Sequence, residues 1–224
     1  MVAQDRGRLI TLEGPEGAGK TVLGQRLAAA LVAAGHSVVL TREPGGTRLG
    51  ERLRTVLLEG GGKIEPRADA LLFNAARAQL VAEILRPALA AGQVVVCARF
   101  ADSTLAYQGY GEGLGIEELR ALAEIATGGL VPDRTILLDL DPEIGLRRKS
   151  DVEQTRFEAA FDLAFHRRVR EGFLELAREE PERFRVVDAS RGLEAVFGDV
   201  LAAAREVTGV AAAGDRAAEG RPAG

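Results

Sequence analysis

An eight-residue stretch near the N-terminus has the residue types and spacing that hold a chain of phosphates. It matches G-x-x-x-x-G-K-[ST], lies between a β-rich run at 8–13 and a helical pattern at 21–34, and consists of Gly14, Pro15, Glu16, Gly17, Ala18, Gly19, Lys20 and Thr21. Glycines let backbone amides approach phosphate oxygens, and the helix start adds positive potential. We expect Lys20 to bridge the β- and γ-phosphates of ATP and the Thr21 hydroxyl to ligate Mg²⁺. An accidental glycine-rich turn is the alternative interpretation.

Apolar runs that alternate with helical patterns must position this loop. The runs predict strands at 8–13, 37–41, 93–97, 135–140 and 185–188. The helical patterns lie at 21–34, 50–58, 68–91 with a bend near Pro87, 116–127, 157–180 and 193–207. Nearly all-apolar strands that alternate with helices are typical of a parallel sheet covered on both faces. We therefore predict a three-layer α/β/α domain with a five-stranded parallel sheet over residues 1–208, followed by a disordered tail at 209–224.

Composition excludes several classes of protein. The 224 residues suffice for one domain, and a net charge of -4 argues against a dedicated nucleic-acid binder. No run of 18 apolar residues predicts a membrane span, and the single cysteine, Cys97, excludes a disulfide framework and fits a reducing cytoplasm. Two histidines leave little room for a His-built metal site. Only three of the 29 cationic residues are lysines, so Lys20 within the motif is informative.

Four further motifs follow the phosphate loop in order. They read TREPGG at 41–46, LFNAAR at 72–77, ARFADSTLAYQG at 98–109 and GGLVPD at 128–133. Together with the loop, they resemble the thymidylate kinase (dTMP kinase) family over about residues 8–205. The resemblance implies a P-loop kinase with a short lid that transfers the γ-phosphoryl group of MgATP to dTMP, giving dTDP and ADP in dTTP biosynthesis. It also implies a homodimer.

The resemblance supplies an acceptor site. It implies that dTMP contacts Glu43, Arg54, Phe73, Arg77, Arg99, Thr104, Tyr107 and Gln108. Phe73 offers an aromatic face for thymine, and Arg77, four residues later on the same helix face, can donate to the base carbonyl O4. Thr104 and Gln108 match positions that hydrogen-bond the base edge. A core phenylalanine and a solvated surface arginine are the alternative interpretations of the first pair.

The remaining acceptor residues match positions near the sugar and phosphate. Arg54 and Arg99 resemble the clamps of the acceptor phosphate, because a guanidinium fork suits a phosphate dianion. The counterpart of Glu43 lies near the dTMP sugar and phosphate. Tyr107 matches the tyrosine that occupies the space of a ribose 2′-hydroxyl, and a half-buried packing tyrosine is the alternative.

A basic stretch at 147–156 is expected to be the lid. The phosphate loop contains no arginine, so the resemblance implies that the lid brings one to the transferred phosphoryl group, where a cation stabilises developing charge. The residues implied to be catalytic are Lys20, Arg99, Arg148, Arg156 and Glu16. A plain solvated charge run is the alternative for the lid arginines.

The chain departs from the family pattern at two positions. The family has Asp before the clamp arginine, where this chain has Ala98, and Asp before the second lid arginine, where it has Thr155. For Ala98, three interpretations remain open: another carboxylate replaces the missing one, the enzyme is slow, or the chain binds nucleotides without useful catalysis. The candidate carboxylates are Glu13, Asp102 and Asp139.

Overall fold

A computed structural model describes residues 6–59, 64–149 and 161–209 and places the sequence around one parallel sheet. Its strands are β1 (Arg8–Glu13), β2 (Val38–Arg42), β3 (Val94–Ala98), β4 (Arg134–Asp139) and β5 (Phe184–Asp188), in the order β2-β3-β1-β4-β5. The predicted five-stranded parallel sheet is confirmed. The central strand β1 ends between β3 and β4, where Leu12 pairs with Ala98 and Glu13 with Leu137. Ligands of open parallel sheets bind at such a carboxyl edge.

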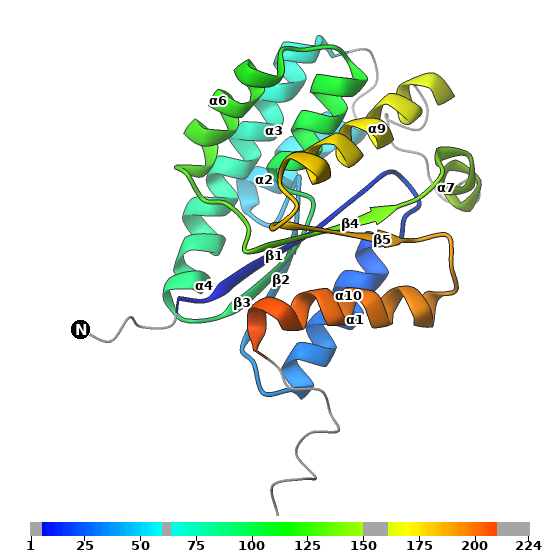
Figure 1. Ribbon diagram of the computed structural model, residues 1–224. Helices are drawn as coiled ribbons and strands as arrows, with labels where there is room; N and C mark the ends of the chain where they lie inside the picture. The colour runs from blue at the N-terminus through cyan, green and yellow to red at the C-terminus, as the bar shows by residue number, and fades with distance from the viewer. Residues whose placement is uncertain (1–5, 60–63, 150–160, 210–224) are drawn as a thin grey trace, which may run out of the picture.

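Two helices cover one face of the sheet. They are α1 (Lys20–Ala33) and α10 (Leu193–Thr208), which lie together below the sheet in Figure 1. Leu27 and Leu31 of α1 and Val200 of α10 are fully buried against the strand residues Ile10 and Leu12. This packing fixes the start of α1, and with it Lys20, at the end of β1.

A thicker helical layer covers the opposite face (Figure 1). It contains α3 (Pro66–Leu80), α4 (Arg86–Ala90), α5 (Ala101–Thr104), α6 (Ile116–Thr127) and α9 (Leu163–Glu179), together with the π-helical segments η2 (Val81–Leu85) and η3 (Leu105–Gly111). At the carboxyl edge, α2 (Arg48–Arg54) continues into the π-helical segment η1 (Thr55–Glu59), and α7 (Pro142–Lys149) follows β4. None of the described helices is long and apolar enough to cross a membrane.

Several helices differ in detail from the sequence prediction. The one predicted at 50–58 begins at Arg48 and becomes π-helical from Thr55. The helix predicted at 68–91 begins at Pro66, after Glu65 caps it, and its irregularity is the π-helical turn η2 just before Pro87. Proline lacks an N–H and crowds the carbonyl four residues earlier, which accounts for a wider turn there. The segment from Ala101 to Gly111 lies outside the predicted helical patterns, but it is helical and carries Thr104 and Gln108 four residues apart. The described part of the helix predicted at 157–180 begins at Leu163, where the Asp162 carboxylate caps the Phe165 amide.

Candidate functional site

The phosphate loop joins β1 to α1 in a conformation that only glycine permits easily. Gly17 has φ 71°, and a Cβ there would lie 2.2 Å from the carbonyl oxygen of Gly145 in α7. Lys20 folds back over the loop, and its Nζ donates to the carbonyls of Gly14 at 2.9 Å and Pro15 at 2.7 Å. Burial, assisted by the charge of Arg99, lowers the pKa of Lys20 to about 7. The Lys20 side chain thus bonds to loop carbonyls that phosphate oxygens can replace.

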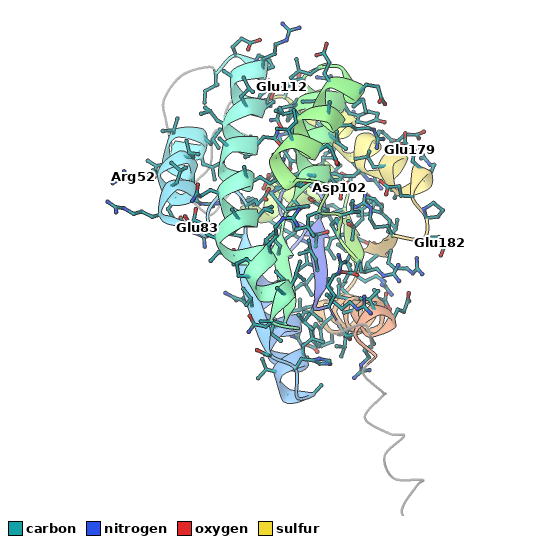
Figure 2. All side chains as sticks on the ribbon, turned by 90° about the vertical axis from the view of Figure 1, so that its left-hand side faces the viewer. Arg52, Glu83, Asp102, Glu112, Glu179 and Glu182 are labelled. Carbon is teal, nitrogen blue, oxygen red and sulfur yellow. The ribbon has the colours of Figure 1, made fainter. Side chains whose placement is uncertain are left out.

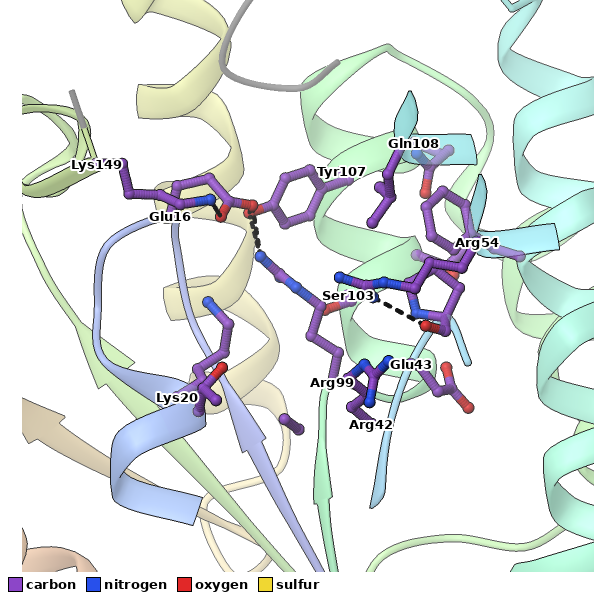
Figure 3. A pocket seen from close by; sticks show the side chains of 16 residues that line it. Glu16, Lys20, Arg42, Glu43, Arg54, Arg99, Ser103, Tyr107, Gln108 and Lys149 are labelled. Atoms are coloured by element: carbon purple, nitrogen blue, oxygen red, sulfur yellow. Dashed lines mark hydrogen bonds and ion pairs between the residues drawn. The ribbon is translucent and has the colours of Figure 1, made fainter. Parts of the chain in front are cut away.

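A pocket opens between this loop and the helices that follow β2 and β3 (Figure 3). Its charged lining is five cations and two carboxylates, namely Lys20, Arg42, Arg54, Arg99 and Lys149 with Glu16 and Glu43. The other lining residues are Thr21, Pro44, Leu58, Phe73, Ala98, Ser103, Thr104, Tyr107 and Gln108. An excess of positive charge in a concave site favours a polyanionic ligand. The acidic net charge of the whole chain conceals this local balance.

Glu16 is the meeting point of several pocket side chains. Its Oε1 accepts hydrogen bonds from Arg99 Nη2 at 2.5 Å and from the Tyr107 hydroxyl at 2.9 Å, and its Oε2 lies 3.5 Å from Lys149 Nζ. Burial opposes ionisation of Glu16, but the charges of Arg99, Lys20 and Lys149 prevail and hold its pKa well below the usual range. Glu16 is thus an ionised carboxylate that ties the phosphate loop to the third strand's arginine.

Arg77 lies behind the pocket rather than in its lining. Its side chain is 1% exposed, and its Nε donates to Glu43 Oε2 at 2.9 Å. Its Nη1 donates to Asn74 Oδ1 at 2.8 Å, and its Nη2 donates to Phe100 O and Thr104 Oγ1, both at 3.0 Å. Arg77 therefore connects β2, α3 and α5, and its contact with the base carbonyl stays a prediction. Burial raises the pKa of Glu43 although Arg77 opposes this.

Gln108 and Phe73 form the far end of the pocket. Gln108 is almost fully buried, and its Nε2 donates to Asp69 Oδ2 at 3.0 Å, which fixes the orientation of the amide. Phe73 is half-buried against the core. Sequence analysis missed Asp69, although it lies four residues before Phe73 and therefore on the same face of α3. Arg54 approaches from α2 and is steadied by a 2.9 Å hydrogen bond from Nη1 to the Pro44 carbonyl.

Three further lining residues with polar or charged side chains are not among the site residues predicted from sequence. Arg42 ends β2, Ser103 lies in α5, and Lys149 ends α7. Arg42 follows a predicted strand and Lys149 falls in the predicted lid, so the position of each residue along the chain is a sequence signal that it belongs to the site. Ser103 required knowledge of the helix after Arg99.

The predicted lid is described only in its first three residues, 147–149, which form the last turn of α7. Arg148 is not among the pocket-lining residues, and its Nη1 donates to Ala189 O at 3.2 Å and Gly17 O at 3.5 Å, along the outer side of the phosphate loop. Arg156, Thr155 and the tail 210–224 lie outside the described residues.

The three carboxylates proposed to replace the missing Asp have different partners. Asp102, labelled in Figure 2, is buried and accepts hydrogen bonds from both Nη atoms of Arg183, at 2.7 and 2.9 Å. Asp139 accepts hydrogen bonds from Nε and Nη2 of Arg170, at 2.7 and 2.9 Å. Glu13 instead accepts hydrogen bonds from the Phe100 N–H and the Ser103 hydroxyl, both of which follow Arg99. It is therefore the candidate that reaches the segment carrying the clamp arginine.

The parallel sheet, the phosphate loop at the end of its central strand and the basic pocket facing a second wall together define a P-loop phosphotransferase acting on a small phosphorylated acceptor. A family model described as thymidylate kinase matches residues 12–200. The thymidylate kinase of Deinococcus radiodurans is 55% identical over 202 residues, which cover 90% of this chain and 98% of the relative. That of Bifidobacterium longum is 50% identical over 205 residues, with the same coverage. The crystal structure of thymidylate kinase from Ehrlichia chaffeensis superposes with a TM-score of 0.73 at 33% identity, covering 88% of this chain and 98% of the other.

The chain belongs to the thymidylate kinase family. Its activity is the phosphorylation of dTMP, with ATP as the nucleotide donor and a metal ion. Nothing in the comparisons favours the alternative of reduced or lost catalysis at Ala98.

Proposed function

We propose that the described pocket carries out this reaction by holding dTMP against α3 and α5, holding the ATP phosphates on the phosphate loop, and placing Arg99 between them. The observation that carries the proposal is the position of Arg99. Its guanidinium reaches Glu16 of the loop, while Arg54 faces it from the opposite wall (Figure 3). A planar fork at the junction of two phosphate sites can bind the acceptor phosphate and stabilise the transferred group.

The acceptor wall selects the base through fixed hydrogen-bond donors. Because Arg77 donates to Thr104 Oγ1, the Thr104 hydroxyl keeps its own hydrogen for a ligand. A base carbonyl such as O4 of thymine accepts that hydrogen, whereas the amino group of cytosine does not. Phe73 supplies the stacking face, and Gln108, held by Asp69, reads the same edge.

The sugar and the acceptor phosphate occupy the middle of the pocket. Glu43 Oε1 is buried and has no hydrogen-bond partner among the described residues, so it is free to accept from a ligand hydroxyl. Tyr107 crowds the sugar and disfavours a ribose 2′-hydroxyl. Arg54 and Arg99 hold the phosphate from two sides.

The donor side is completed by the metal. The Thr21 hydroxyl lines the pocket and would, with phosphate oxygens, supply the oxygen ligands that Mg²⁺ prefers. When bound, Mg²⁺ neutralises charge on the β- and γ-phosphates. Lys20 exchanges its loop carbonyls for phosphate oxygens, and Glu16 orients Arg99. In the same proposal residues 1–208 form the catalytic domain, and Arg148 and Arg156 of the lid at 147–156 add positive charge.

Formation of dTDP and ADP from dTMP and MgATP by the purified chain tests the proposal. We expect turnover by the wild type and strongly reduced turnover by Lys20→Ala. An Ala98→Asp variant addresses the alternative directly: we expect it to change turnover modestly. Turnover in Ala98→Asp together with none in the wild type would contradict the proposal and support a binding protein without catalysis.

We extend the proposal to a cytoplasmic homodimer, as the family resemblance implies. Leu71 of α3 is 57% exposed and Ile125 of α6 is 81% exposed, and Figure 2 faces this pair of helices. Exposed apolar side chains on neighbouring helices favour association. Analytical ultracentrifugation should give twice the chain mass for the wild type and a shift toward the chain mass for Ile125→Glu. A cytoplasmic location fits enzymes of dTTP biosynthesis, and fractionation of cells tests it.

A further inference from the structure

We propose that Glu13 is a positioning residue, whose side chain holds the loop around Arg99 in the conformation that directs the Arg99 guanidinium into the pocket. The inference rests on the proposed function, in which Arg99 lies between donor and acceptor phosphates. It concerns a residue at the end of β1 that lines neither phosphate site. Two independent observations carry it, namely the backbone of Arg99 and the contacts of Glu13.

The backbone of Arg99 needs support. It has φ 71°, and among the described residues it is the one non-glycine position with a positive φ. A residue with a Cβ occupies this region only when surrounding interactions offset the strain. Relaxation to an ordinary extended conformation would turn the side chain away from its present direction. The strain is therefore tied to where the guanidinium lies.

Glu13 makes hydrogen bonds just after the strained residue. Its Oε1 accepts from the backbone N–H of Phe100 at 2.7 Å, and its Oε2 accepts from the Ser103 hydroxyl at 2.6 Å. Ser103 in turn accepts from Arg99 Nη1 at 3.2 Å. Glu13 is fully buried, so these bonds are shielded from competing water. One carboxyl group thus holds both the peptide that follows Arg99 and Ser103, the residue that the Arg99 side chain contacts.

Two further contacts hold the peptides before and after the one that Glu13 holds. The carbonyl of Phe100 accepts from Arg77 Nη2 at 3.0 Å, while the Arg99 N–H donates to Leu12 O at 2.9 Å. The segment after β3 is therefore fixed between β1 and α3. Of these contacts, the pair made by Glu13 holds the peptide directly after the strained residue and comes from a single side chain.

The length of the Glu13 side chain, rather than its charge, should matter. The charged and titratable groups that face it are Asp102 of α5, Arg99, Lys20 of α1 and Cys97 of β3. Burial, and then Asp102, raise the pKa of Glu13 to about 7. Glutamine keeps an oxygen for the Phe100 N–H and can donate to Ser103, whose hydroxyl is able to accept. Aspartate keeps the charge but is one methylene too short to reach both groups.

Steady-state kinetics of Glu13→Gln and Glu13→Asp test the proposal. We expect Glu13→Asp to raise the KM for dTMP about tenfold, with the KM for ATP little changed, because misplaced positioning groups cost this much. We expect Glu13→Gln to stay within about twofold of the wild type, since it preserves both hydrogen bonds. Val200→Ala, a buried change between the sheet and α10, serves as the control for general destabilisation and should leave the KM for dTMP unchanged.

A double-mutant cycle with Arg99→Ala shows whether Glu13 acts through Arg99. We expect Glu13→Asp to have less than about a twofold effect in the Arg99→Ala background, since interacting residues are not additive. A wild-type KM for dTMP in Glu13→Asp, equal effects in both backgrounds, or a Glu13→Gln variant that fails to fold would each overturn the proposal. Absence of dTMP turnover in the wild type would instead contradict the proposed function.

Discussion

The two halves of the pocket are built in different ways. The donor half is one continuous segment, in which glycines shape the backbone and Lys20 bonds to carbonyls five and six residues away. The acceptor half is assembled from distant segments, since Arg77 bonds to groups 34, 23 and 27 residues away in Glu43, Phe100 and Thr104. The donor half therefore holds replaceable contacts, and the acceptor half holds a fixed buried network.

This difference separates catalysis from stability. Side chains in the donor half are occupied by contacts that phosphates can replace, so their loss should affect turnover more than folding. Side chains in the acceptor network satisfy one another in the interior, so their loss leaves buried charge without a partner. Within one pocket, substitutions in the donor half should therefore lower turnover, whereas substitutions in the acceptor network should lower the free energy of unfolding.

The largest expected effect is on the donor side. Lys20→Ala should lower kcat about 10³-fold, because it removes a cation from the transferred phosphoryl group. The midpoint of urea unfolding should hardly change, since the hydrogen bonds that Lys20 makes to described residues go to loop carbonyls. Measuring both quantities on one preparation checks the contrast. A kcat within tenfold of the wild type would contradict the role of the loop.

On the acceptor side, Arg77→Met should lower the free energy of unfolding by roughly 3–5 kcal/mol, since it leaves Glu43 buried without its cation. Urea titration followed by circular dichroism measures this. Arg67→Met, on the exposed surface of the same helix, is the matched control and should stay within about 0.5 kcal/mol. Equal losses for the two variants would contradict a fixed acceptor network.

The pH dependence of stability reports on the strand that joins the halves. Burial and Asp102 raise the pKa of Glu13 to about 7 from an ordinary value of 4.5. Between these values the folded protein retains a proton that the unfolded chain has released, so stability falls as pH rises through this window, by up to about 3 kcal/mol. Denaturation at pH 5 and pH 7.5 should show the fall in the wild type and a smaller one in Glu13→Gln. An equal loss of stability between the two pH values in both proteins would contradict a raised pKa of Glu13.

The smallest expected effect concerns helix caps. The N-cap residue of α1, Gly19, has no side chain to cap the helix, which leaves the first backbone N–H groups of α1 available to phosphates. In contrast, Thr47 caps α2 by accepting from the Gly50 N–H at 2.9 Å. Thr47→Ala should cost about 1 kcal/mol. Thr55→Ala, an exposed threonine after the same helix, should cost less than about 0.5 kcal/mol in the same thermal melts. A result in reverse order would show that the α2 cap is unimportant.

Sequence predicted the fold and the donor half well because both depend on local patterns. The apolar runs gave the five strands, and the spacing from Gly14 to Thr21 located the phosphate loop. The acceptor residues were found by resemblance, but the buried position of Arg77 was not, since its partners Glu43 and Thr104 come from other elements. The hydrogen bonds of Glu13 join groups 87 and 90 residues away, and no local pattern indicates them. The roles of individual site residues stay predictions.

Selectivity among acceptors tests the division into a general donor half and a thymine-selective acceptor half most directly. The measurement is kcat/KM of the wild type for dTMP, dUMP, dCMP and UMP at saturating MgATP, with ADP release as the readout. The fixed Thr104 donor and Tyr107 predict that dTMP is the best acceptor and that dCMP is at least about 10²-fold poorer. A dCMP value equal to or above that for dTMP would contradict the account.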